Sequence, residues 1–303
     1  MLDAIIMLMT ELVGASHVAV DEPMSKHTTF KIGGRADLLI IPQSIPQLKT
    51  VIKFLKQMKV PYFIMGNGSN LLVGDKGIRG AVIKITGDIG KCDVEGTTIV
   101  AESGIMLARL ANTAYKNGLS GLEFVAGIPG TLGGAIYMNA GAYGGEMKNV
   151  VESVTYLDKY GNVETISGEK CQFGYRHSIF SDNDFVILSC RINLKNGEEA
   201  TIKAEMDDLS ERRISKQPLN KPSAGSTFKR PEGYFAGKLI QDSGLKGYRI
   251  GGAMISEKHS GFVINEDKAT ANDVVALIRH VQAEVKDKFG VDLDTEVKSV
   301  GEF

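Results

Sequence analysis

Cysteine is scarce in this chain of 303 residues, and its three copies, Cys92, Cys171 and Cys190, form no C-x-x-C pair. An odd and widely spaced set of cysteines indicates neither a disulfide framework nor a zinc site. We therefore expect no bound metal and a reducing compartment, for which the cytoplasm is the simplest setting.

An excess of charge of one sign is also missing. The chain carries 35 Lys+Arg against 36 Asp+Glu, a net charge of −1, which provides no electrostatic footprint for nucleic acid or an anionic membrane. No apolar run reaches membrane-spanning length. The apolar start, Met1 to Met9, carries Asp3 and no basic leader, so it predicts a packed helix and not a signal peptide. The composition therefore indicates neither a nucleic-acid nor a membrane partner.

The length allows two or three compact domains, and the elements change character along the chain. Apolar periodicity predicts a strand over 36–41, a helix over 45–58 and a strand over 60–65. This strand, helix and strand open a first sub-domain, placed at residues 1–85.

Strands and hairpins dominate the middle of the chain, placed as a second sub-domain at residues 86–205. A third domain is placed at residues 206–303, since prolines mark a change of segment after a charged amphipathic helix over 198–214. It contains a helix from Thr270 to Phe289 with its own capping residues. Together these elements predict an α+β fold.

Two glycine-rich segments are the most informative feature. Gly127 to Gly145 holds seven glycines among apolar residues, and Gly66-Asn-Gly-Ser-Asn70 follows a predicted strand directly. Glycine permits close backbone approach, and successive free N–H groups bind phosphate. Tight turns and close helix packing are the alternative explanation. Two such segments about sixty residues apart favour a pyrophosphate held between two loops.

Neither segment is a standard nucleotide motif. Neither segment ends in the Gly-Lys-Ser/Thr of a P-loop. The segment from Gly66 to Asn70 leads into a predicted strand and not into a Rossmann helix. A dinucleotide such as FAD fits better than a mononucleotide. The predicted cofactor-binding residues are Gly66, Asn67, Gly68, Ser69, Asn70, Gly127, Ile128, Gly130, Thr131, Gly133 and Gly134.

Four further positions carry chemistry that periodicity cannot bring together. Ser226 sits on a small-residue turn beside Lys229 and Arg230, and Arg176 follows an aromatic residue on another turn. Arg176 could hold a carboxylate in a bidentate pair. Glu296 and His259 are acid and phosphate-binding candidates. For each residue an ordinary solvated surface role is the alternative.

Six motifs in series resemble one family, UDP-N-acetylenolpyruvoylglucosamine reductase, over about residues 25–300. The motifs are Thr29-Phe-Lys-Ile-Gly-Gly34, Gly66-Asn-Gly-Ser-Asn-Leu-Leu-Val73, Gly121-Leu-Glu-Phe-Val-Ala-Gly-Ile-Pro-Gly-Thr-Leu-Gly-Gly134, Gly174-Tyr-Arg176, Ala224-Gly-Ser226 and Thr295-Glu-Val297. Each motif is weak alone, but their order along one chain is specific.

The resemblance implies a vanillyl-alcohol-oxidase-type (PCMH-type) FAD-binding fold in two sub-domains, followed by a C-terminal substrate-binding domain. It also implies non-covalent FAD, NADPH as donor, and reduction of UDP-N-acetylglucosamine enolpyruvate to UDP-N-acetylmuramate for peptidoglycan. Hydride reaches the enolpyruvyl terminal carbon, and Ser226 then protonates the alpha carbon, with Arg176 and Glu296 as the other catalytic residues. Ser226 is a credible donor only if cations or dipoles stabilise its alkoxide, and Lys229 is one source.

For the substrate, the resemblance implies contacts from Tyr175, Lys216, Arg230 and His259. Only about eighteen residues separate Arg176 from Leu194, with no room for the insertion that carries a lid tyrosine in one branch of the family. The chain therefore resembles the shorter, lidless type. An FAD-dependent alcohol or hydroxy-acid oxidase of the same fold, and a non-enzymatic flavin or UDP-sugar sensor, are the alternatives.

Overall fold

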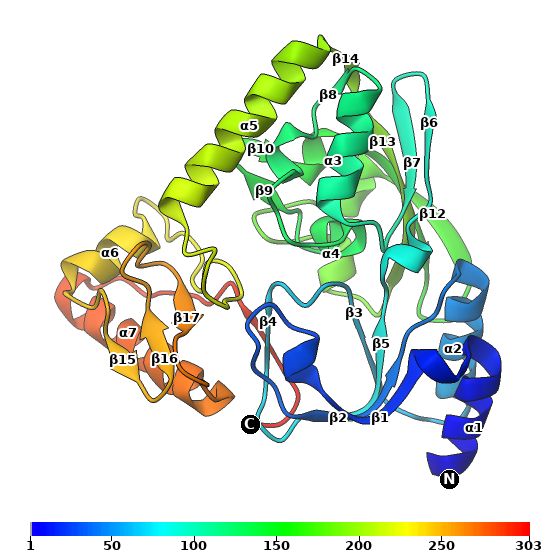
Figure 1. Cartoon of the computed structure of the whole chain (residues 1–303), viewed down its shortest axis with the longest axis horizontal. Helices are drawn as coiled ribbons and strands as arrows, with labels where there is room; N and C mark the ends of the chain where they lie inside the picture. The colour runs from blue at the N-terminus through cyan, green and yellow to red at the C-terminus, as the bar shows by residue number, and fades with distance from the viewer. Residues whose placement is uncertain (1) are drawn as a thin grey trace. The chain divides into compact units, whose positions relative to one another are not determined.

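The computed structural model describes residues 2–303. Its chain forms two compact units, each built from three segments. The first unit comprises Met1–Ala19, Leu39–Asn67 and Val82–Arg213, and the second comprises Val20–Leu38, Gly68–Ala81 and Ile214–Phe303. The architecture mixes helices and strands throughout, as the sequence predicts (Figure 1).

A four-stranded sheet has the order β1-β2-β5-β3. Its strands are β1 Val18–Pro23, β2 Arg35–Ile40, β3 Tyr62–Met65 and β5 Ile78–Lys84. The predicted strands at 36–41 and 60–65 are confirmed as β2 and β3, but β5 lies between them. Strand order depends on pairing between distant segments, which local periodicity does not report.

Helix α2, Ile45–Gln57, confirms the predicted helix over 45–58. It begins where the Ser44 side chain accepts a hydrogen bond from the Gln47 N–H, and Pro46 occupies its first turn. Its apolar face is fully buried, and α1, Leu2–Val13, packs beside it. The predicted N-terminal helix is thus also confirmed.

An antiparallel five-stranded sheet forms the core of the first unit, with the order β12-β11-β13-β7-β6. Its strands are β6 Cys92–Glu95, β7 Thr98–Glu102, β11 Val151–Leu157, β12 Val163–Ser167 and β13 Val186–Asn193. Helix α4, Leu132–Tyr137, contacts β13 and β7. Helices α3, Leu107–Lys116, and α5, Glu199–Lys216, complete the helices here. Two short strand pairs join β8 Leu119–Ser120 to β14 Lys195–Asn196 and β9 Gly141–Ala142 to β10 Gly145–Glu146.

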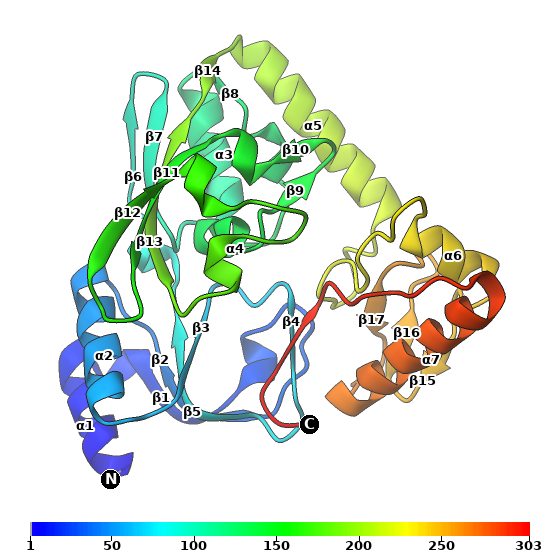
Figure 2. The same cartoon turned by 180° about the vertical axis from the view of Figure 1, so that it is seen from behind.

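The second unit contains a three-stranded sheet, β15-β16-β17, with α7 alongside it (Figure 2). The strands are β15 Arg249–Ile250, β16 Ala253–Ile255 and β17 Val263–Asn265, and the helices are α6 Ala236–Asp242 and α7 Ala271–Phe289. Near the C-terminus, β18 Lys298–Val300 pairs in parallel with β4 Leu71–Val73.

Helix α7 confirms the predicted helix and its signals. Thr270 and Asp273 form a reciprocal capping box at its start. Gly290, with φ of +70°, takes the left-handed conformation that ends the helix. The Asp75 carboxylate also accepts hydrogen bonds from the Ala271 and Asn272 N–H groups, at 2.7 and 3.0 Å. A carboxylate at a helix N-terminus stabilises the helix dipole.

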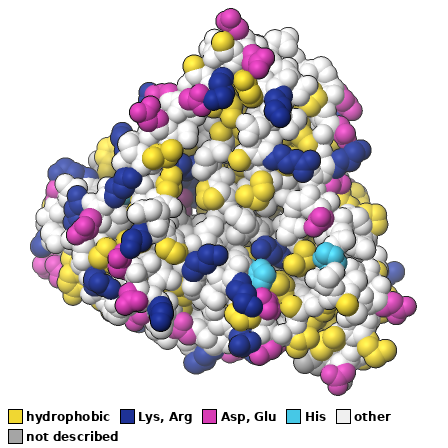
Figure 3. All heavy atoms as spheres, in the orientation of Figure 1, with side chains coloured by type: hydrophobic (Ala, Val, Ile, Leu, Met, Phe, Trp, Pro, Cys, Tyr) yellow, Lys and Arg dark blue, Asp and Glu magenta, His cyan; other side chains and the backbone are white. Residues whose placement is uncertain are grey.

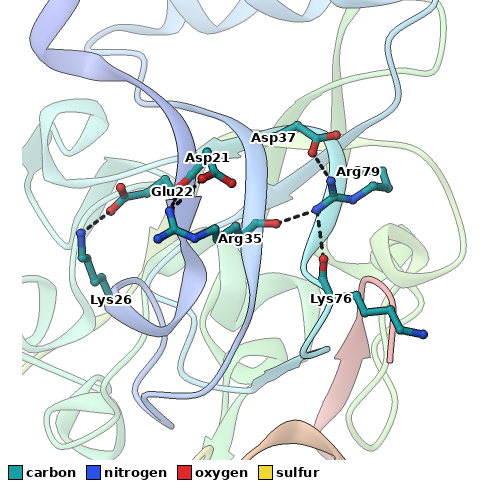
Figure 4. Close-up of polar contacts among 7 residues, drawn as sticks. All are labelled: Asp21, Glu22, Lys26, Arg35, Asp37, Lys76 and Arg79. Atoms are coloured by element: carbon teal, nitrogen blue, oxygen red, sulfur yellow. Dashed lines mark hydrogen bonds and ion pairs between the residues drawn. The ribbon is translucent and has the colours of Figure 1, made fainter.

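Charged side chains of both signs are spread over the face displayed in Figure 3. In the second unit they form an exposed network on β1, β2 and β5 (Figure 4). Arg35 pairs with Asp21 at 3.0 Å, and Arg79 pairs with Asp37 while donating to the Arg35 carbonyl oxygen at 2.8 Å. Exposed pairs of this kind contribute little stability individually.

Candidate active site

The two glycine segments meet within the first unit. The Asn67 side-chain amide donates to the Pro129 carbonyl oxygen at 2.7 Å. A Cβ atom added at Gly66 would overlap the Thr131 hydroxyl. The end of β3 and the loop before α4 are therefore in direct contact, and glycine at position 66 is required by this close approach.

In the segment from Gly127 to Gly145, two glycine N–H groups are bonded within the protein and one glycine packs closely on a neighbour. The Gly133 N–H donates to the Ser103 carbonyl oxygen at 2.8 Å, and the Gly130 N–H donates to Ile128 at 2.9 Å. A Cβ atom at Gly133 would lie 3.0 Å from the Ser103 Cβ atom. Gly133 thus packs closely on Ser103, and the N–H groups of both Gly130 and Gly133 are already bonded inside the protein.

Two buried polar atoms near this segment lack a protein partner. The Ser103 hydroxyl, packed against Gly133, and one carboxylate oxygen of Glu123 are both buried without a hydrogen bond among residues 2–303. Glu123 is 6% exposed, and its other oxygen accepts from the Gly121 N–H at 2.8 Å. Orphaned buried polar atoms are rare and indicate a missing ligand or water. A hydroxyl-rich, phosphate-bearing cofactor such as FAD fits this polar lining.

Arg213 brings a cation to the same segment. Its guanidinium lies where a Cβ atom on Gly127 would come within 2.9 Å of Nη1. Burial lowers the pKa of Arg213, while Tyr143 acts to raise it. Guanidinium still keeps its charge at neutral pH. Sequence reasoning missed this residue, because one arginine in a charged helix gives no distinguishing signal.

Tyr175 and Arg176 share a tight turn in the first unit. Gly174 and His177 pair across it, and Arg176 has a φ of +56°, which is unusual for a residue other than glycine. The Arg176 guanidinium lies 5.2 Å from the centre of the Tyr175 ring, and Tyr175 is 52% exposed. Strained backbone of this kind concentrates at functional sites.

The buried Asn139 side chain hydrogen-bonds to the turn that carries Tyr175 and Arg176. It is 1% exposed and donates from Nδ2 to the Gly174 carbonyl oxygen at 2.9 Å and to Glu146 Oε2 at 3.0 Å. Its Oδ1 accepts from the Lys148 N–H at 3.0 Å. Hydrogen bonds from Lys148, opposed by desolvation and helped by Asn139, lower the pKa of Glu146. The second glycine segment is thereby tied to the Tyr175–Arg176 turn.

Ser226 and Glu296 come together in the second unit through the backbone of Thr227. The Glu296 N–H donates to the Thr227 carbonyl oxygen at 2.8 Å, and Phe228 pairs antiparallel with Thr295. Ser226 follows Gly225, whose φ of +75° requires a glycine-like conformation. Two candidates seventy residues apart in sequence thus lie on segments joined by one isolated antiparallel bridge.

His259 joins them from the other side of the same segment. The Thr227 N–H donates to the Gly261 carbonyl oxygen at 2.9 Å. The His259 Nδ1 atom accepts from the Gly261 N–H at 3.1 Å, which leaves Nε2 to carry the ring proton. Burial lowers the pKa of His259. A neutral imidazole that donates from Nε2 can still bind a phosphate oxygen.

The loop from Gly68 to Asn70 also contacts the segment that carries Glu296 and leads into β18. The Asn70 side-chain amide donates to the Glu296 carbonyl oxygen at 3.1 Å, and the Asn70 carbonyl oxygen accepts from the Lys298 N–H at 2.9 Å. Asn70, predicted from its motif to contact a cofactor, therefore has a structural contact with the acidic candidate. Lys216 ends α5 and is exposed.

All three cysteines are free thiols, and Cys171 and Cys190 are buried. Among residues 2–303 no group of three or more His, Cys, Asp or Glu side chains is arranged to hold a metal ion. None of the helices in that range is long and apolar enough to cross a membrane.

Comparison with known proteins defines the class first. Residues 36–167 match the family model of an FAD binding domain, and residues 217–300 match the C-terminal domain of UDP-N-acetylenolpyruvoylglucosamine reductase. The fold is also similar to that of a Phl p 4 variant described as a glucose oxidase, with a TM-score of 0.50 and 12% identity, over 71% of this chain and 50% of that one. The predicted α+β, PCMH-type FAD-binding fold is confirmed.

The family follows from closer relatives. The UDP-N-acetylenolpyruvoylglucosamine reductase of Caldanaerobacter subterraneus subsp. tengcongensis is 53% identical over 292 residues, 96% of each chain. The crystal structure of the enzyme from Thermus caldophilus has a TM-score of 0.80 and 34% identity, covering 93% of this chain and 97% of that one. The chain belongs to the UDP-N-acetylenolpyruvoylglucosamine reductase family, so it is an FAD-dependent oxidoreductase.

Proposed function

We propose that this protein reduces UDP-N-acetylglucosamine enolpyruvate to UDP-N-acetylmuramate, a precursor of peptidoglycan, with NADPH as electron donor. The observation that carries the proposal is the pairing of Ser226 with Glu296 through the Thr227 backbone. A carboxylate and a hydroxyl held on two hydrogen-bonded segments suit the protonation of a carbon next to a carboxylate.

We propose that FAD is held non-covalently by the two glycine segments. Gly66, Asn67, Gly127, Ile128, Gly130, Thr131, Gly133 and Gly134 would line it in the first unit, with Gly68, Ser69 and Asn70 following in the chain. The unpartnered Ser103 hydroxyl supports a polar ligand here. Bound FAD supplies a hydride, taken from NADPH and passed to the enolpyruvyl terminal carbon.

The catalytic groups act on the charge that this hydride creates. Electron density moves to the alpha carbon and the adjacent carboxylate, and Arg176 stabilises the resulting negative charge. Ser226 donates its Oγ proton to the alpha carbon, which completes the lactyl ether. Glu296 holds the enol form of the carboxylate through a hydrogen bond. Lys229, half-buried and three residues beyond Ser226, stabilises the serine alkoxide.

The substrate would be held by Tyr175, Lys216, Arg230 and His259. The exposed Tyr175 ring offers an apolar face, and the three other residues offer donors to a diphosphate. We retain the division into an FAD-binding part at residues 1–85 and 86–205 and a substrate-binding part at residues 206–303 as a functional proposal. The free thiols are in keeping with a cytoplasmic enzyme.

An anaerobic visible spectrum tests the whole reaction. The purified protein should show a flavin band that NADPH bleaches and that UDP-N-acetylglucosamine enolpyruvate restores. Recovery with oxygen but not with the enolpyruvyl compound would favour an oxidase and overturn the proposal.

The variant Ser226→Ala separates the two half-reactions. Flavin reduction by NADPH should keep its wild-type rate, while reoxidation by the enolpyruvyl substrate should fall by about 10²–10³-fold, the scale of losing one transition-state donor. A wild-type rate of reoxidation would exclude Ser226 as proton donor.

A further inference from the structure

An exposed aromatic platform lies just beyond the Ser226 segment. The Phe235 ring is 62% exposed, and the Arg230 guanidinium lies 4.0 Å from its centre. Arg230 Nε donates to the Tyr234 carbonyl oxygen at 3.3 Å, which fixes the guanidinium over the ring. An exposed aromatic ring held in place by a guanidinium offers a face on which a planar ligand can stack.

The platform is rigid at its backbone although its ring is exposed. The Phe235 carbonyl oxygen accepts from the Lys238 and Leu239 N–H groups at 3.0 and 3.1 Å, so this residue starts helix α6. The Tyr234 N–H closes a turn onto Pro231 at 3.2 Å, and Gly233 takes a φ of +75° within it. The backbone that carries the ring is therefore held by hydrogen bonds on both sides of Phe235.

The short connection from Ser226 to Arg230 also limits how far apart these two residues can be. Between Ser226 and Arg230 the backbone is held by hydrogen bonds at Thr227 and Lys229, the latter donating to Asp294 at 2.8 Å. Four residues of chain span at most about 14 Å, so the Ser226 and Arg230 backbones lie no farther apart than that. A nucleotide sugar that reacts near Ser226 is long enough to place its diphosphate at Arg230.

His259 contacts the helix that begins at Phe235. Helix α6 packs on its ring, since a Cβ atom added at Gly237 would lie 3.4 Å from the His259 Cε1 atom. Arg230 and the Nε2 proton of His259 both attract an anion, and the Phe235 ring offers an uncharged face beside them. This combination of a cation, a neutral donor and an aromatic plane suits a nucleoside diphosphate.

We propose that Phe235, backed by Arg230, is the stacking platform for the uracil ring of the UDP-sugar substrate. This assignment rests on the proposed function for its substrate, but its binding test is independent of turnover. A planar heterocycle on Phe235 would leave the diphosphate next to Arg230. The competing planar rings, nicotinamide and adenine of the donor, are distinguished by the experiment below.

The test compares Phe235→Ala with the wild-type holoenzyme by calorimetry, using UDP and inorganic pyrophosphate as probes. Stacking of one base contributes about 1–3 kcal/mol, so UDP affinity should fall by roughly 5- to 150-fold while pyrophosphate affinity is unchanged. Tyr160→Ala is the matched control, because Tyr160 is 76% exposed with the Lys159 ammonium 5.1 Å from its ring centre. It should leave UDP binding unchanged.

Further variants keep the test decisive. Phe235→Leu retains apolar bulk and should also lose UDP affinity, whereas Phe235→Tyr should retain it. Unchanged UDP affinity in Phe235→Ala, or an equal loss of pyrophosphate affinity, would overturn the platform. If Phe235→Ala leaves UDP binding unchanged and raises only the NADPH concentration needed for flavin reduction, the ring binds the donor and the proposal is overturned. If the wild type binds UDP through Phe235 yet fails to turn over the enolpyruvyl substrate, the platform stands and the proposed function fails.

Discussion

Replacing Asn139 by alanine should destabilise the first unit and slow catalysis together. The side chain is 1% exposed and makes three hydrogen bonds, one of them to the Glu146 carboxylate. A neutral hydrogen bond contributes about 0.5–1.5 kcal/mol and one to a charged group about 1.5–3 kcal/mol. Asn139 also has a φ of +42°, which alanine tolerates less well than asparagine.

These contributions add to about 3–5 kcal/mol of unfolding free energy. Urea denaturation followed by circular dichroism measures this free energy. The dependence of the unfolding free energy on urea concentration should stay the same in the variant, because a change would mean altered compactness and not stability alone. Asn183→Ala is the control, since its exposed amide makes a single bond to the Ile179 carbonyl oxygen and should cost less than about 1 kcal/mol.

Catalysis supplies the second measurement. Without the bond to Gly174, the Tyr175–Arg176 turn loses its buried support, so substrate-driven reoxidation of the flavin should slow in Asn139→Ala. Flavin content should remain near that of the wild type. A destabilisation below about 1 kcal/mol, or wild-type reoxidation in a clearly destabilised variant, would refute the reasoning.

Three other predictions concern the cofactor, helix α7 and the proposed proton donor. Gly66→Ala should lower FAD affinity at least about tenfold in equilibrium dialysis, because the new Cβ overlaps the Thr131 hydroxyl, while Gly87→Ala, which meets no atom within 4 Å, should not. A hydrogen bond from the Thr270 backbone lowers the pKa of Asp273, although desolvation opposes this shift. The ionised Asp273 therefore stabilises the fold fully above the unfolded pKa of about 3.9. This stabilisation is lost as the pH falls through the lower pKa of the folded state. Asp273→Asn should therefore cost about 1 kcal/mol at pH 7 and progressively less below about pH 4, and a difference that stays constant with pH would contradict this assignment. For Ser226→Ala, a solvent kinetic isotope effect on flavin reoxidation that matches the wild type would argue against proton donation by this residue.

The regular elements could be predicted because their signals are local. Helix α7 has its caps and its apolar stripe within one continuous segment, and α2 has a capping serine and a single buried face. Periodicity and capping act over a few residues, so they are visible in the chain itself. The strand order was not visible, since β5 enters between β2 and β3 only by long-range pairing.

The candidate site divides in the same way. Its residue types could be identified from the glycine segments and from the resemblance to a family, but their neighbours could not. Arg213 beside Gly127, Asn139 beneath the Tyr175–Arg176 turn and the exposed Phe235 ring carry no motif of their own. Each is defined by what lies next to it in space.

By itself, the sequence determined the α+β composition, the glycine segments suited to a phosphate-bearing cofactor, and the identity of the catalytic candidates. Only the tertiary structure decided that the Thr227 backbone joins Ser226, His259 and Glu296, and that Asn67 links the two glycine segments. The physical reason is that these contacts are hydrogen bonds between segments about thirty to seventy residues apart. Their geometry depends on the packing of the whole unit and not on any local preference.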